Sequence, residues 1–229
     1  MQLTWLGHAS FKLKTKLGDS QARNEVAMEG KFVYIDPVVD KYGESWRSLE
    51  KADLVLVSHW HAGHGSLETI NHIRTDSTLI AGSAEASSEI DGCETLAMGE
   101  EKMFGGIKVT AIPAYTPRRP EHQERGNVLG FVLEIEGKKI YFASDTGLIP
   151  EMQALGAIDA AILPVGGTDT MSAAEAMKAV QLINPKIAIP AHWGSKEGTI
   201  DDAESFKEMV ETRTKTQVRV LQPGETTEL

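Results

Sequence analysis

The chain has 229 residues, of which 41% are hydrophobic, and a formal charge of −10 from 23 basic and 33 acidic residues. This length suits one large domain or two small ones, and the acidic balance argues against nucleic acid as a partner because polyanion-binding proteins present basic surfaces. Cys93 is the one cysteine, which excludes an intrachain disulfide and a cysteine-based zinc site and favours a reducing, cytoplasmic compartment.

Apolar runs typical of β-strands open the chain. They are "QLTWLG" (2–7), "SFKLKTKL" (10–17), "KFVYIDP" (31–37) and "DLVLVSH" (53–59), and a helical pattern follows at 66–74. We interpret the first run as a strand and not as a secretory signal, since it has neither a basic start nor a long apolar stretch. No apolar run approaches about 18 residues, which argues against a membrane partner.

The second half of the chain repeats this order. Strand-like runs occupy 107–114, 128–137 and 138–145, with a hairpin expected around Gly137, and further runs at 160–167, 186–192 and 217–221 alternate with helices. Ser172 and Glu175 form a capping box before one helix, and Asp201 with Glu204 predicts the start of a second helix over 203–213. Hairpins followed by β-α alternation, twice over, predict an α/β (α+β) fold with two sheets and helices packed outside them, in a single domain over 1–229.

Polar residues stand where several predicted strands end. Because strand ends in layered α/β folds meet at one edge, we expect these side chains to converge, and histidine with carboxylate suggests a metal site. They are Asp36, His59, His61, Asp145 and His192.

Three of the seven histidines, His59, His61 and His64, fall within six positions. His59 and His61 point the same way in extended backbone, and His64 follows a turn that glycines permit. Imidazole suits zinc, iron, nickel or copper. Taken alone, Asp145 in "SDTG" is as typical of a turn residue as of a ligand, and His192 is as typical of an ordinary histidine as of a ligand. Their position at the same strand edge as the histidine cluster favours ligands for both.

Several motifs in order resemble the metallo-β-lactamase superfamily, most closely its branch of metal-dependent hydrolases that includes the L-ascorbate-6-phosphate lactonase. The similarity covers nearly the whole chain, and the resemblance implies a four-layer αβ/βα sandwich with metals at the sheet edge. The motifs are "TWLGHASFKL", "FVYIDP", "VLVSHWHAGH", "IPAY", "YFASDTG", "LPVGG", "IPAHWGS" and "LQPGETTEL".

The resemblance also implies a set of ligands for one or two divalent metals per chain, with zinc expected first and manganese, iron or nickel as alternatives. The first metal is expected on His59, His61 and His122, and the second on His64 and His192, with Asp145 bridging. His122, in "PEHQERG", is the candidate for the family's middle histidine, and the alternative is an ordinary loop histidine. His8, in "LGHAS", matches a family position near the site and is interpreted either as a substrate or outer contact or as a strand-end residue.

The family's first motif has an aspartate where this chain has Gly63, and no acid lies between Leu54 and Leu67 to replace it. The second metal thereby loses a carboxylate ligand, and the catalytic set of Asp145, His192 and position 63 loses its usual proton-handling group. Three explanations stay open: a natural enzyme with one metal or a weak second one, a natural protein that has lost activity, or a residue changed deliberately.

Two classes of function follow. The first is a metal-dependent hydrolase of a small ester, lactone or phosphate-bearing substrate, in which Arg118, Arg119, Arg125 and Lys196 meet an anionic group. The pattern of the arginine cluster favours a solvated loop, and an anion-binding role is the alternative. The second is a non-catalytic metal- or ligand-binding module on the same fold, which Gly63 favours. A homo-oligomer is compatible with the sequence but no feature of it defines an interface.

Overall fold

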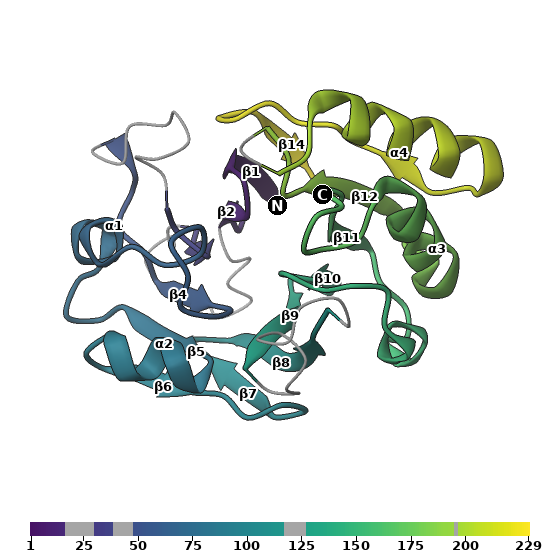
Figure 1. Cartoon of the computed structure of the whole chain (residues 1–229). Helices are drawn as coiled ribbons and strands as arrows, with labels where there is room; N and C mark the ends of the chain where they lie inside the picture. Colours follow the sequence, from purple (N-terminus) through teal and green to yellow (C-terminus); the bar gives the residue numbers. More distant parts are fainter. Residues whose placement is uncertain (17–29, 39–47, 117–126, 195–196) are drawn as a thin grey trace.

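The computed structural model describes residues 1–16, 30–38, 48–116, 127–194 and 197–229. Within these ranges two seven-stranded sheets stack face to face, with α1 and α2 on one side and α3 and α4 on the other (Figure 1). The predicted four-layer αβ/βα sandwich, a mixed α+β architecture, is confirmed.

The first sheet has the order β14-β1-β2-β3-β4-β5-β6. Its strands are antiparallel from β14 to β3 and parallel from β3 to β6. They are β1 (Gln2–Gly7), β2 (Ser10–Lys14), β3 (Phe32–Ile35), β4 (Leu54–Val57), β5 (Leu79–Gly82), β6 (Cys93–Thr95) and β14 (Thr226–Glu228).

The second sheet has the order β13-β12-β11-β10-β9-β8-β7 and repeats this plan, antiparallel from β7 to β10 and parallel from β10 to β13. The hairpin between β9 and β10 turns at Gly137, as predicted, where φ is +72°. Its strands are β7 (Glu101–Phe104), β8 (Ile107–Ala114), β9 (Val128–Ile135), β10 (Lys138–Phe142), β11 (Ala160–Pro164), β12 (Ile187–Ala191) and β13 (Gln217–Val218).

The helices are α1 (Leu67–Ile73), α2 (Ala84–Glu89), α3 (Ala173–Ile183) and α4 (Ile200–Arg213), with a 3₁₀ turn η3 at Pro150–Ala154. The capping box of Ser172 and Glu175 is present at α3. The predicted start of α4 is wrong: the capping residues are Thr199 and Asp202, so the helix begins at Ile200. Both pairs have the capping-box spacing, and the sequence alone did not discriminate between them. None of the helices in the described residues is both long and apolar enough to cross a bilayer.

The main hydrophobic core fills the space between the sheets. Phe11 on β2 meets Phe142 on β10 at a ring-centroid distance of 6.2 Å, and Phe131 on β9 stacks 6.5 Å from Phe142. A second cluster joins Val55 and Val57 on β4 to the buried face of α1. Every residue of β4 is buried, as expected for a parallel strand covered on both faces.

The carboxyl ends of β3 and β4 in one sheet and of β10 and β12 in the other come together at one edge of the sandwich. A backbone hydrogen bond from His192 N to His8 O, 3.0 Å long, joins the two sheets there. Trp5 on β1 and Trp193 after β12 support the junction with rings 4.7 Å apart. The polar residues that end these strands therefore share one rigid edge, as the sequence predicts.

Candidate metal centre

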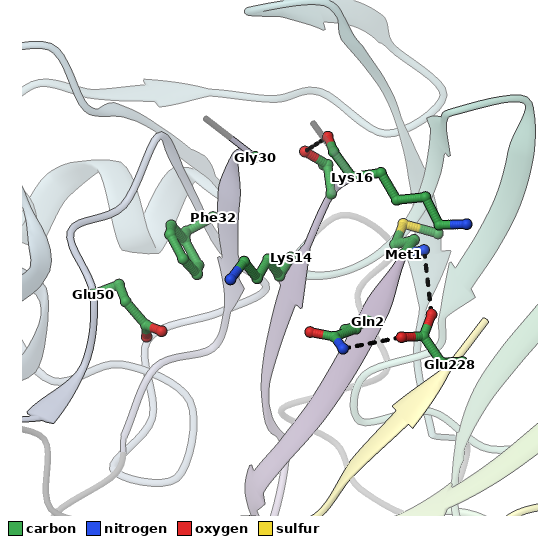
Figure 2. Close-up of a pocket in the computed structure, with 9 residues that line it drawn as sticks. Met1, Gln2, Lys14, Lys16, Gly30, Phe32, Glu50 and Glu228 are labelled. Atoms are coloured by element: carbon green, nitrogen blue, oxygen red, sulfur yellow. Dashed lines mark hydrogen bonds and ion pairs between the residues drawn. The ribbon is translucent and has the colours of Figure 1, made fainter. Parts of the chain in front are cut away.

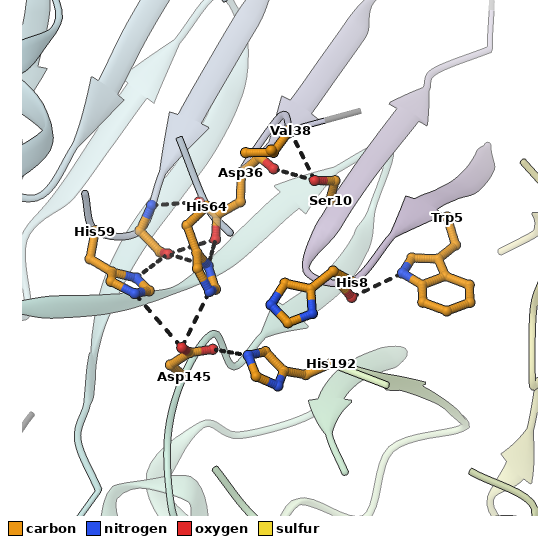
Figure 3. A network of polar contacts seen from close by, with 10 residues as sticks. Trp5, His8, Ser10, Asp36, Val38, His59, His64, Asp145 and His192 are labelled. Carbon is orange, nitrogen blue, oxygen red and sulfur yellow. Dashed lines mark hydrogen bonds and ion pairs between the residues drawn. The ribbon is translucent and has the colours of Figure 1, made fainter. Parts of the chain in front are cut away.

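The first sheet contributes a buried network built on Asp36, which follows β3 (Figure 3). Ser58 donates to it twice, from the backbone N to Oδ1 at 2.7 Å and from Oγ to Oδ2 at 2.6 Å. His64 Nδ1 lies 2.7 Å from the same Oδ2. Since β3 and β4 are parallel neighbours, their ends place Asp36 directly beside the histidine motif.

A tight turn brings His64 back toward the strand end. The backbone N atoms of His64 and Gly65 both donate to His61 O, at 2.9 and 3.1 Å. A Cβ at position 65 would lie 2.5 Å from the Trp60 ring, so this close approach requires glycine. The turn, which the sequence predicted from its glycines, thus points His64 into the buried edge.

Hydrogen bonding fixes which nitrogen of His59 and of His64 faces the site. Ser58 Oγ gives its one hydrogen to Asp36, so His59 Nδ1, 2.9 Å away, must donate to that oxygen and leave a lone pair on Nε2. His64 likewise has Nδ1 against Asp36 and Nε2 turned inward. His192 Nδ1 lies 3.5 Å from Glu197 Oε2. Outer acceptors that orient the inward nitrogen in this way are typical of metal-ligating histidines.

The inward nitrogens converge on Asp145, which follows β10 in the second sheet (Figure 3). His64 Nε2 and His59 Nε2 lie 3.2 and 3.7 Å from Oδ2, and His192 Nε2 lies 3.2 Å from Oδ1. All four residues are buried. One carboxylate therefore contacts three imidazoles through both of its oxygens, which is the position predicted for a bridging ligand.

The contacts between the carboxylates and the imidazoles, together with burial, shift the pKa values of the groups at this centre. Burial by itself raises the pKa of Asp145, but the charges of His192 and His64 and their hydrogen bonds hold it well below the ordinary value. Burial by itself lowers the pKa of His64, and Asp145 together with Asp36 raises it to about 10. Burial raises the pKa of Asp36 and that of Glu197. Without a metal, His64 lies between two acidic side chains, and its raised pKa favours the protonated imidazole at neutral pH.

The backbone is strained at the same place. Six described non-glycine residues have positive φ angles, and four of them surround this centre: His8 (+50°), Asp36 (+48°), Ser144 (+59°) and His192 (+59°). Such conformations cost free energy and persist where the surroundings hold them, often at functional sites.

Not every predicted site residue joins the cluster. His61 is exposed, with its ring 4.6 Å from that of His59, and it belongs to neither of the ligand groups found among the described residues. Gly63 lies half-buried in the turn before His64. The predicted role of His122, and those of the cations Arg118, Arg119, Arg125 and Lys196, fall outside the described residues. The division of the ligands between two metals stays a prediction.

Sequence reasoning missed the roles of Ser58 and Glu197. Ser58 precedes the first motif histidine without any distinctive pattern, and Glu197 lies five residues after His192 in a loop. Asp36 was placed at the right edge by the strand-end pattern, but its contact with His64 was not foreseen.

A cavity of about 730 Å³ lies at the opposite end of β1, β2 and β3 (Figure 2). Its two carboxylates already have partners: Glu50 lies 3.0 Å from Lys12, and Glu228 accepts from Gln2 at 2.9 Å and lies 3.5 Å from the N-terminal ammonium. Lys14 sits 5.4 Å from the centre of the Phe32 ring. This cavity lacks the convergent donors of the opposite edge, and we therefore place the functional centre at Asp145.

The fold and this cluster define a class of metal-binding proteins with two stacked sheets and a histidine–carboxylate centre at their edge. A family model described as a β-lactamase superfamily domain matches residues 2–192. The chain belongs to the β-lactamase superfamily. The resemblance to that superfamily is confirmed, whereas the closer likeness to the lactonase stays a prediction.

Relatives and solved structures agree with this assignment. The chain is 34% identical over 245 residues to the UPF0173 metal-dependent hydrolase of Methanopyrus kandleri and 32% identical over 252 residues to that of Pelotomaculum thermopropionicum, with 100% of both chains covered in each case. Igni18, a metallo hydrolase from Ignicoccus hospitalis, is 25% identical with a TM-score of 0.80, over 100% of this chain and 98% of that one. The family is thus one of metal-dependent hydrolases.

The donor set fits a divalent metal. His59, His64 and Asp145 each offer a ligand atom within 4.8 Å of the others, and so do His8, His64 and His192, all of them buried. Imidazole nitrogens with a carboxylate oxygen suit zinc and its neighbours in the first transition row. The outer acceptors on Nδ1 leave Nε2 of His59 and His64 available as ligand atoms.

Metal binding at pH 7 should release about one proton from His64. Its raised pKa of about 10 means that the metal-free side chain is protonated at pH 7, and a ligand nitrogen must be deprotonated. Metal affinity should therefore rise with pH up to about 10. Calorimetric zinc titrations in buffers of different ionisation enthalpy measure the released protons. A binding enthalpy that is the same in every buffer would contradict this assignment.

Proposed function

We propose that this chain hydrolyses a small ester, lactone or phosphate-bearing substrate at the Asp145 centre. The observation that carries the proposal is the convergence of three inward Nε2 atoms on one carboxylate, with ligands from both sheets. The expected metal is zinc, with manganese, iron or nickel as alternatives, in one or two copies. The expected compartment is the cytoplasm. The expected partner is a small-molecule substrate that carries an anionic group.

His59, His64, His192 and Asp145 would hold the metal. When bound, it supplies Lewis acidity for a carbonyl or phosphoryl oxygen and an activated water. Asp36 and Ser58 keep the histidine nitrogens oriented through their hydrogen bonds. Asp145 lowers the cost of burying positive charge at the sheet edge, since an uncompensated buried charge is expensive.

A second candidate, a non-catalytic metal- or ligand-binding module, is favoured by Gly63. The chain has no carboxylate at the position that the family motif uses for proton handling. On this alternative the centre binds its metal but does not turn over esters, lactones or phosphates.

Replacing Gly63 with aspartate separates the two candidates. In a hydrolase that lacks only this proton-handling group, Gly63→Asp should raise kcat by about 10²-fold or more, because a positioned proton-transfer group contributes about 10²- to 10⁴-fold. Gly63 is not among the described glycines with positive φ, so the aspartate meets no left-handed strain. The assay compares zinc-loaded wild type and variant on p-nitrophenyl acetate, p-nitrophenyl phosphate and a γ-lactone.

Ser77→Asp is the control, because it adds the same charge at an exposed turn position outside the centre that likewise has no positive φ. Hydrolysis that is absent from both the wild type and Gly63→Asp, with zinc bound to both, would reject the hydrolase and favour the binding module.

A further inference from the structure

The second predicted metal position lacks a ligand in this chain. With glycine at position 63, it keeps His64, His192 and the shared Asp145. We propose that His8 supplies the missing ligand, so that its imidazole takes the role of the aspartate in the family motif. This inference rests on the proposed metal centre and adds a residue to it.

Proximity is the first support. One potential ligand atom from each of His8, His64 and His192 lies within 4.8 Å of the other two, and all three residues are buried. Nitrogens around a tetrahedral zinc lie about 3.3 Å apart, given Zn–N bonds of about 2.0–2.1 Å. Modest side-chain rotations therefore bring the three nitrogens onto one ion.

The orientation of the His8 ring agrees with this role (Figure 3). Its centroid lies 3.9 Å from the His192 ring and 5.7 Å from the His64 ring. The same His64 and His192 place their Nε2 atoms 3.2 Å from Asp145, on opposite oxygens of the carboxylate. His8 thus lies beside the two histidines that the second metal position keeps.

The backbone holds His8 in place independently of its side chain. Its carbonyl oxygen accepts hydrogen bonds from Trp5 Nε1 and from His192 N, both 3.0 Å long. Its φ of +50° is unusual for a histidine and is maintained by these two contacts. The bond to His192 crosses between the sheets, so the position of His8 is coupled directly to that of a predicted ligand.

An imidazole in place of a carboxylate changes the charge and the donor atoms of the second metal position. It removes one negative charge and replaces an oxygen donor with a nitrogen donor. Nitrogen-rich sites favour zinc over manganese or magnesium. Zinc is therefore the appropriate probe for this position.

The test counts zinc ions per chain in four proteins, by calorimetric titration and by elemental analysis after desalting. The variants are His8→Gly, which tolerates the positive φ, the control His72→Ala, and the double variant His8→Gly/Gly63→Asp. We expect about two zinc ions in the wild type and in His72→Ala, as in two-metal hydrolytic sites, and about one in His8→Gly. The double variant should recover the second ion, because the aspartate of the family motif replaces the lost imidazole.

The outcomes separate this inference from the metal centre itself. Two zinc ions in both the wild type and His8→Gly would overturn the role of His8 and leave the metal centre standing, as would one ion in the wild type. A double variant that still binds one ion would show that His8→Gly acts through the fold, and would also overturn the inference. A wild type that binds no zinc would reject the proposed centre together with the role of His8.

Discussion

Asp145→Asn should lower zinc affinity by roughly 100-fold or more and reduce kcat/KM on the best substrate by about 10³-fold, which corresponds to the loss of several kcal/mol of Lewis-acid stabilisation. The side chain keeps its shape but loses the charge that compensates His64 and His192. An asparagine also carries an NH₂ group that cannot act as a ligand, so it cannot contact the imidazoles through two oxygens.

Zinc titration and steady-state kinetics measure the two effects on the same preparation. Asp76→Asn is the control, because it removes one negative charge from an exposed loop far from the centre. If Asp145→Asn binds zinc as tightly as the wild type, Asp145 is not a ligand and the proposed centre is wrong.

Asp36→Asn should destabilise the metal-free chain by about 3–5 kcal/mol, the range found when one partner of a buried ion pair is removed. All three of its neighbours, Ser58 N, Ser58 Oγ and His64 Nδ1, act as donors to its two oxygens. In asparagine, an NH₂ group replaces one of these two oxygens. That NH₂ group cannot accept a hydrogen bond and would face another donor. Asparagine tolerates the φ of +48°, so the backbone is not the cause of the loss.

Zinc affinity should fall by about 10- to 100-fold in the same variant, because an oriented His64 depends on its outer acceptor. Urea unfolding of the metal-free protein and calorimetric zinc titration test the two effects, again beside Asp76→Asn. A free energy of unfolding within about 0.5 kcal/mol of the wild-type value, as for ordinary surface substitutions, would rule out a structural role for the Asp36 network.

The strand-end pattern located much of the centre in advance. Apolar runs that stop at a polar residue predicted the positions of His59, Asp145 and His192, because parallel strands bring their carboxyl ends to one edge. The pattern also predicted the repeated order of the two sheets. It missed α2, whose sequence "AEASSE" has only Ala86 buried and so lacks apolar periodicity.

Contacts between distant segments could not be read from the sequence. The bond between Asp36 and His64 depends on β3 and β4 being adjacent, and nothing local to either residue specifies that pairing. The approach of His8 to His192 depends on two separate sheets meeting. Local patterns predict elements and their ends, whereas such contacts arise from packing.

The location of Asp145 and His192 on one sheet, and of His59 and His64 on the other, has a consequence for assembly of the protein. Neither sheet holds all of the proposed ligands, so we expect a divalent metal to bind the docked sandwich selectively. At a free metal concentration [M], binding adds RT ln(1 + [M]/Kd) to the free energy of unfolding, because the metal binds only when the two sheets are docked. We therefore expect the metal to bind late in synthesis, after the strand that precedes His192 has been made and has docked.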